Sequence, residues 1–76
     1  MDDREMLERR LAHTERRITD LEQHVARQRT VVAWLDTSGR GGSETAEIAR
    51  GLLQTMELNV RREMSERRLL RGRLGR

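Results

Sequence analysis

The sequence predicts an all-α protein, a two-helix antiparallel coiled-coil hairpin that dimerises into a four-helix bundle. Three observations lead to this prediction. Apolar residues recur about every 3.5 positions in two long segments, proline is absent, and a short glycine cluster separates the segments. Such a repeat keeps one apolar stripe of each helix turned toward a partner helix.

The first helix is expected over about residues 2–37. Asp2 followed by Glu5 resembles a capping box, which places the start of the helix near residue 2. No Gly or Pro interrupts residues 1–38. The seam advances in alternating steps of four and three residues and is mostly apolar; its members are Leu7, Leu11, Thr14, Ile18, Leu21, Val25, Gln28, Val32 and Leu35.

A turn is expected at residues 38–43, where three glycines interrupt the helical pattern. Gly39 can adopt the left-handed conformation that ends a helix, and Ser43 can cap the next one. The turn does not match a phosphate-binding P-loop, because that motif needs a preceding strand and a Gly-Lys-Ser/Thr ending.

The second helix is expected over about residues 44–71, followed by a frayed tail over 72–76 that contains Gly72 and Gly75. In an antiparallel hairpin, the numbers of facing residues add up to a constant. The pairing of Leu35 with Ala46 and of Leu7 with Leu74 satisfies this rule. The predicted seam of this helix is Ala46, Ala49, Leu53, Met56, Val60, Glu63, Arg67, Leu70 and Leu74.

Polar residues weaken the middle of this seam. Glu63 and Arg67 are four residues apart and can pair along the helix, and Thr14 faces them. Two interpretations stay open: a polar layer that fixes the register, or charge tolerated in an exposed two-stranded seam.

The composition indicates one small domain that needs a partner. The chain has 76 residues, is 34% hydrophobic and contains no cysteine. A chain this short buries only about 60% of its unfolded surface, so self-association is expected. Neither a signal peptide nor an apolar run long enough to span a membrane is present, so a cytoplasmic location is expected.

Four apolar residues near the turn do not fit the seam of a single hairpin. We predict that they form the interface of a homodimer whose turn-proximal halves make the four-helix bundle. The alternative is a solvated indole, stacked on by Arg27 or Arg50. The predicted interface residues are Val31, Trp34, Ile48 and Leu52.

The C-terminal segment is strongly basic. Residues 61–76 carry seven Arg and two Glu, and every basic residue of the chain apart from its two histidines is Arg. Folding back would bring this end beside the acidic start of the chain, which contains Asp2, Asp3, Glu5 and Glu8. The alternative function is therefore binding of nucleic acid or anionic surfaces. The candidate anion-binding residues are Arg61, Arg62, Arg67, Arg68, Arg71 and Arg73.

Catalytic, metal and cofactor sites are not predicted. His13 and His24 share a helix face and Asp20 lies near them, but a metal site usually needs three or four converging ligands. Neither histidine is placed to activate a serine. The sequence thus predicts a non-enzymatic interaction or oligomerisation module, a homodimeric scaffold or adaptor without a cofactor.

One family resemblance supports the hairpin. The residues that carry it are Arg10-Leu11-Ala12-His13, then His24-Val25-Ala26-Arg27-Gln28, and in the second helix Thr45, Ala49, Leu52-Leu53 and Met56. Over residues 9–76 the chain resembles a group of short alphaproteobacterial helical-hairpin proteins. This resemblance implies a helical hairpin and no assigned activity.

Overall fold

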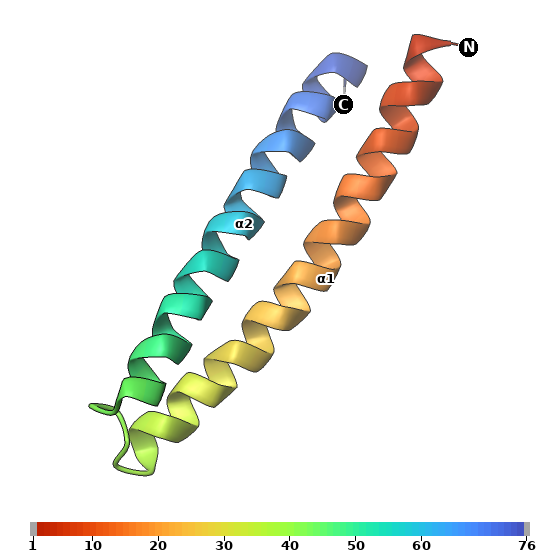
Figure 1. Ribbon diagram of the computed structural model, residues 1–76. Helices are drawn as coiled ribbons and strands as arrows, with labels where there is room; N and C mark the ends of the chain where they lie inside the picture. The colour runs from red at the N-terminus through yellow and green to blue at the C-terminus, as the bar shows by residue number, and fades with distance from the viewer. Residues whose placement is uncertain (1, 76) are drawn as a thin grey trace.

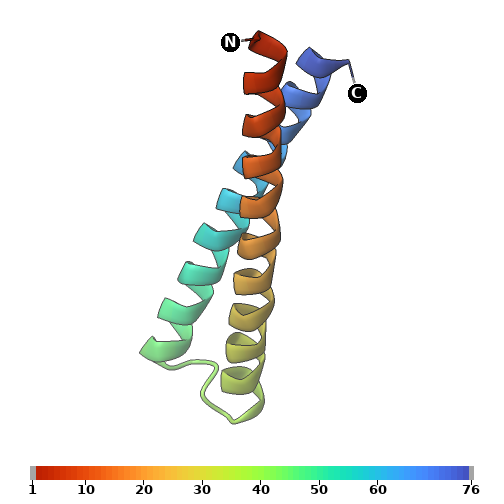
Figure 2. The same ribbon diagram turned by 90° about the vertical axis from the view of Figure 1, so that its right-hand side faces the viewer.

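The computed structural model describes residues 2–75 as two long helices packed side by side in an antiparallel hairpin (Figure 1). Helix α1 spans Asp3–Thr37 and helix α2 spans Glu44–Leu74. The molecule measures 56 × 18 × 14 Å. Viewed from the side, the helices cross at a shallow angle (Figure 2). The predicted all-α two-helix hairpin is confirmed; Met1 and Arg76 of the predicted domain lie outside the described residues.

Helix α1 begins where its first side-chain cap satisfies an otherwise free backbone N–H. The Asp2 carboxylate accepts a hydrogen bond from the Arg4 backbone N–H at 3.1 Å. A capping box would use the N–H of Glu5, one residue further on, so the cap is an Asp cap of a simpler kind. The predicted start near residue 2 is confirmed.

The turn ends α1 with two hydrogen bonds that require a left-handed residue. Gly39 has φ +80°, which the missing Cβ makes inexpensive. The Arg40 N–H then reaches the Leu35 carbonyl at 2.9 Å, and the Gly39 N–H reaches that of Asp36 at 3.4 Å. This pair of bonds is a Schellman motif. It confirms the predicted role of Gly39.

The turn also rests on a second glycine and on an arginine from α2. A Cβ on Gly41 would lie 2.8 Å from the Asp36 Oδ1, so a side chain there would displace that carboxylate. The Arg50 guanidinium donates to the Gly41 carbonyl at 2.8 Å and to Asp36 Oδ1 at 3.3 Å. Arg50 thereby ties the turn to both helices.

Helix α2 begins at the predicted cap and ends later than predicted. The Ser43 hydroxyl accepts from the Ala46 N–H at 3.1 Å. The helix continues through Gly72 to Leu74, where Gly75 adopts φ +75°. The predicted end near Arg71 and the fraying from residue 72 are therefore wrong for residues 72–74. Leu74 is buried between the helices, and this burial outweighs the weak helix preference of Gly72.

The core is the predicted seam. Within residues 2–75, every buried residue belongs to it, and every other seam residue is half-buried. Two apolar clusters form, one at each end of the hairpin. The cluster at the open end contains Leu7, Leu11, Leu70 and Leu74. The cluster beside the turn contains Val32, Leu35, Ala46 and Ala49.

Polar residues in the middle of the seam are paired across it. Glu63 forms an ion pair with Arg17 of α1 at 3.3 Å, so the predicted pairing with Arg67 along the helix is replaced by a contact between helices. The Gln28 Nε2 donates to the backbone carbonyl of Ala49 at 2.9 Å. In the described part of the chain, every buried side-chain nitrogen or oxygen has a hydrogen-bond partner. The middle of the hairpin thus holds polar groups without leaving them unsatisfied.

Candidate interaction surface

The two flanks of the seam differ in chemistry. On a helix, the residue just before a seam position and the residue just after it lie on opposite flanks of the seam. In an antiparallel hairpin, the preceding residues of both helices fall on the same side of the molecule. We name this side the Trp34 side, because Trp34 precedes the seam residue Leu35, and the other the ion-paired side.

The ion-paired side is closed by charge pairs between the helices. Three of them join residues that directly follow seam positions, at N–O distances of 3.0 to 3.3 Å. These pairs are Glu15–Arg71, Arg29–Glu57 and Asp36–Arg50. Each exposed pair contributes about 0–1 kcal/mol, so their main effect is to fix which residues face one another.

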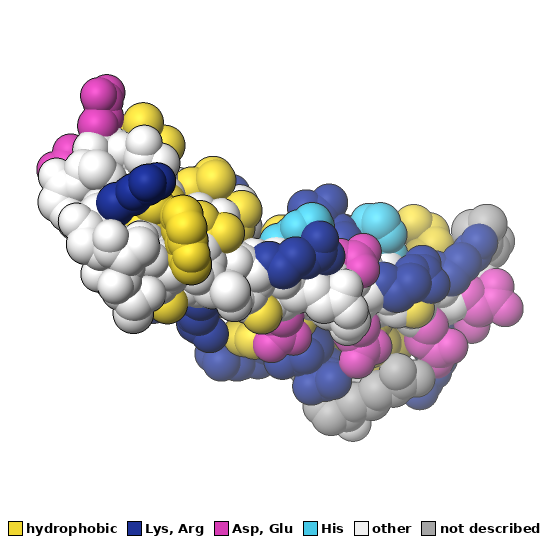
Figure 3. All heavy atoms as spheres, turned by 90° about the horizontal axis from the view of Figure 1, so that it is seen from below, with side chains coloured by type: hydrophobic (Ala, Val, Ile, Leu, Met, Phe, Trp, Pro, Cys, Tyr) yellow, Lys and Arg dark blue, Asp and Glu magenta, His cyan; other side chains and the backbone are white. Residues whose placement is uncertain are grey.

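The Trp34 side carries an exposed apolar patch next to the turn, formed by the four predicted interface residues. We name it the turn-end patch. Figure 3 shows apolar side chains gathered toward the turn end of the face it presents, with charged side chains further along. The exposed fractions are Val31 44%, Trp34 57%, Ile48 65% and Leu52 48%.

The Trp34 indole is partly covered by an arginine from the turn. The Arg40 guanidinium lies 5.7 Å from the ring centroid, a cation–π distance. The predicted stacking partners were Arg27 and Arg50, but Arg50 is engaged with the turn instead. More than half of the Trp34 surface stays exposed despite this contact.

Two further exposed apolar residues lie on the same side at the open end of the hairpin. Met6 and Leu69 directly precede the seam residues Leu7 and Leu70 and are 55% and 66% exposed. They were not predicted as surface features. The sequence feature that could have identified them is their position just before a seam residue. Leu58, also exposed, lies on the outer surface of α2 and belongs to neither side.

Between the two apolar ends, the Trp34 side is charged. Arg10 pairs with Glu66 across the seam at 2.7 Å, and Arg17 pairs with Glu63. Asp20 and Arg62 also directly precede seam positions here. The Trp34 side is therefore apolar beside the turn, carries charges of both signs through the middle, and is apolar again at the open end.

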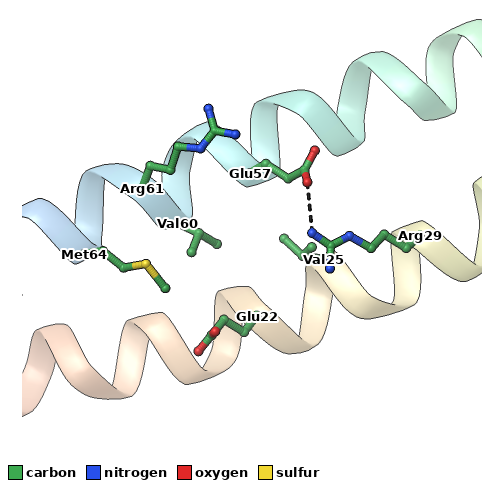
Figure 4. Close-up of a pocket in the computed structure, with 7 residues that line it drawn as sticks. All are labelled: Glu22, Val25, Arg29, Glu57, Val60, Arg61 and Met64. Atoms are coloured by element: carbon green, nitrogen blue, oxygen red, sulfur yellow. Dashed lines mark hydrogen bonds and ion pairs between the residues drawn. The ribbon is translucent and has the colours of Figure 1, made fainter.

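A hollow of about 320 Å³ opens on the ion-paired side near the middle of the hairpin (Figure 4). Val25 and Val60 line it, together with charged side chains, and the Arg29–Glu57 pair closes one end. It occurs where the seam lacks large buried side chains. Two carboxylates and two guanidinium groups are among its lining residues, and Glu57 is half-buried beside Arg29.

The predicted anion-binding arginines do not form one surface. Arg67 is half-buried in the seam, and Arg71 is paired with Glu15. Arg61 and Arg68 follow seam positions, whereas Arg62 and Arg73 precede them. Within residues 2–75, the four exposed arginines without an ion pair are thus divided between opposite sides of the hairpin. Among the described residues, the acids of the five ion pairs between the helices are Glu15, Asp36, Glu57, Glu63 and Glu66, and none of them belongs to the acidic start of the chain.

The histidines do not assemble a metal site. Among the described residues, no group of three His, Asp or Glu side chains is placed to hold an ion. His13 and His24 both precede seam residues and lie on the Trp34 side, exposed. In the described part of the chain, neither helix has an apolar stretch that could cross a membrane.

Comparisons with protein-family models, with curated proteins and with solved structures gave no match. The resemblance to alphaproteobacterial hairpin proteins therefore stays a prediction. The interaction surface rests on the side chains and contacts described above.

Proposed function

We propose that the protein is a non-enzymatic oligomerisation module, a scaffold or adaptor that acts as a homodimer. Two hairpins with coiled-coil seams associate into a four-helix bundle through their Trp34 sides. The observation that carries this proposal is the turn-end patch. Four large apolar side chains, each 44–65% exposed, lie together on one side of a hairpin that has no third layer to cover them.

The size of the molecule supports the same function. A two-helix layer has a single seam, and its two apolar clusters are small and stand at opposite ends. Small domains without disulfides or metals gain stability by association. A second hairpin placed on the Trp34 side supplies the missing apolar layer.

The second candidate function is binding of nucleic acid or an anionic surface. Four exposed arginines near the C-terminus have no ion pair within residues 2–75, which favours it. They are Arg61, Arg62, Arg68 and Arg73. Their division between two sides of the hairpin argues against a single phosphate-tracking groove, and no aromatic residue lies among them to stack on bases.

Sedimentation equilibrium over a concentration series tests the proposal. The expected species is a dimer whose dissociation constant changes far less between about 50 mM and 200 mM salt than the roughly 1,000-fold or more expected for phosphate binding, because apolar contact is weakly screened. Fluorescence of Trp34, the single tryptophan, should shift to shorter wavelength as the dimer forms. A monomer at all concentrations would refute the dimer. Tight, steeply salt-dependent binding of an oligonucleotide by such a monomer would favour the second candidate.

A further inference from the structure

We propose that the two hairpins of the dimer lie with both turns at the same end, so that α1 of each copy packs against α2 of the other. The two-fold axis then runs along the length of the hairpin. This inference rests on the proposed homodimer and adds its orientation. Three features of the Trp34 side support it: the match of apolar residues, the match of charges and the area available.

The apolar match follows from the register of the hairpin. Residues that face each other across the seam lie at equal distances from the turn, as Leu35 and Ala46 do. With both turns at one end, residues at equal distances also face each other between copies. Trp34 of one copy then comes opposite Ile48 of the other, and Val31 comes between Ile48 and Leu52. The turn-end patch of one copy therefore contacts only the turn-end patch of the other copy.

The charges of the central region match in the same orientation. Asp20 of one copy comes opposite Arg62 of the other, and Arg17 comes midway between Arg62 and Glu66. The two-fold axis repeats the contact of Asp20 with Arg62. These two opposite charges thus face each other in the part of the interface that has no apolar residues.

The reversed orientation places like groups together. With the turns at opposite ends and full overlap, α1 packs on α1 of the other copy. Residue 20 is the centre of α1, which spans Asp3–Thr37, so Asp20 would face Asp20. Val31 and Ile48 of the patch would face the charged residues Arg10 and Arg73, while Trp34 and Leu52 would face the apolar Met6 and Leu69. The facing of Asp20 with Asp20 and of two patch residues with arginines disfavours this arrangement.

A reversed dimer that overlaps only at the turn-end patches is too small. The whole Trp34 side measures 56 Å by 18 Å, about 1,000 Å², against the roughly 800 Å² per partner of a typical stable interface. Overlap restricted to the turn-proximal halves would bury only about half of that face, roughly 500 Å². Only full overlap reaches the usual size, and full overlap with matched charges requires the turns at the same end.

Spin-label distances measured on the dimer test the orientation. The chain has no cysteine, so Gly42→Cys in the turn and Glu5→Cys near the start of α1 each place one label per copy. A Cβ at Gly42 meets no neighbour, and Glu5 is exposed. With helix layers roughly 10 Å apart, the proposed dimer gives distances under about 35 Å at both sites.

The reversed dimers give different pairs of distances. With a rise of 1.5 Å per residue, full reversed overlap separates the labels by about 50 Å at either site. Overlap of the turn-proximal halves alone gives about 20 Å at Gly42 and about 80 Å at Glu5. Either pattern in a dimer would overturn the orientation while leaving the proposed function standing. If the labelled chain and the unmodified protein both sediment only as monomers, the proposed orientation and the proposed dimer are both wrong.

A charge exchange provides an independent test. Asp20→Arg and Arg62→Asp should each weaken the dimer about tenfold, because each places like charges opposite one another. The double variant should recover most of the loss, since it restores opposite charges with their positions exchanged. Ser65→Arg adds a positive charge on the outer surface of α2, away from the proposed interface, and should leave the dimer unchanged. Failure of the double variant to recover dimerisation would refute the facing of Asp20 and Arg62.

Discussion

Replacing Trp34 by alanine should disrupt the dimer without unfolding the hairpin. A buried tryptophan covers up to about 250 Å². Trp34 is 57% exposed in one chain, which leaves about 140 Å² for a partner to cover. At about 25 cal/mol per Å², that area corresponds to about 3.5 kcal/mol as an upper limit for each copy.

The expected loss is smaller than this limit. Alanine retains some contact, and the partner must compete with the Arg40 contact, worth about 0.5–1 kcal/mol at an exposed site. We therefore expect about 2 kcal/mol per copy, in the range of interface hot spots. Two copies give about 4 kcal/mol, which weakens the dissociation constant about 1,000-fold.

Sedimentation equilibrium measures this change, and circular dichroism confirms that the helices remain. Leu58→Ala is the matched control, because Leu58 is 56% exposed but lies on the outer surface of α2. It should change the dissociation constant less than about threefold, consistent with a surface substitution within ±0.5 kcal/mol. Equal effects of the two substitutions, or an unchanged dimer in Trp34→Ala, would show that the turn-end patch is not the interface.

Three further predictions concern the stability of the hairpin, each measured by thermal or urea unfolding at fixed protein concentration. Gly51→Ala should raise the free energy of unfolding by about 1 kcal/mol, because the new Cβ meets no neighbour and alanine favours a helix. Gly39→Ala should lower the free energy of unfolding by about 1 kcal/mol, because Gly39 has φ +80°, which a residue with a Cβ adopts only at a cost. The opposite order for these two glycines would contradict the described turn. Leu70→Ala should cost about 2–5 kcal/mol, since Leu70 is buried in the open-end cluster; a loss below that of an exposed leucine would contradict its burial. Glu57→Gln should cost less than about 1 kcal/mol, because its ion pair with Arg29 is exposed, and a larger loss would mean that the pair does more than align the helices.

The seam was predictable from the sequence because a repeat of 3.5 residues has one apolar stripe and one antiparallel register. Ile18, Leu35 and Leu70 are buried where the repeat places them. The turn was predictable as well, since Gly39 and Ser43 have strong local preferences that the packing does not oppose.

Contacts between helices were harder to predict than positions on one helix. The Glu63–Arg17 pair replaces the pairing with Arg67 because the side chain of Arg17 crosses the seam from the neighbouring flank. The bond from Gln28 to the Ala49 carbonyl depends on how closely the two backbones approach, which small residues in the facing helix permit. The end of α2 was missed because a local rule about Gly72 ignored the burial of Leu74.

The exposed apolar residues of the open end show a similar limit. Met6 and Leu69 each precede a seam leucine by one residue, a rise of only about 1.5 Å along the helix. They face solvent because one residue also turns the side chain away from the seam around the helix axis. Val31, Trp34, Ile48 and Leu52 were identified from the sequence as residues outside the seam. That they share a single side follows from the rule that each precedes a seam residue.

The separation of the two apolar clusters has a consequence for local opening. Because Thr14, Gln28, Glu63 and Arg67 interrupt the apolar seam between the open-end cluster and the cluster beside the turn, either cluster can come apart while the other stays closed. The turn and Arg50 tether the cluster beside the turn, whereas no such connection joins the two helices beside the open-end cluster within residues 2–75. The free energy of local opening should therefore be lower near Leu11 and Leu70 than near Leu35 and Ala49. Amide hydrogens near the first pair should exchange with solvent faster.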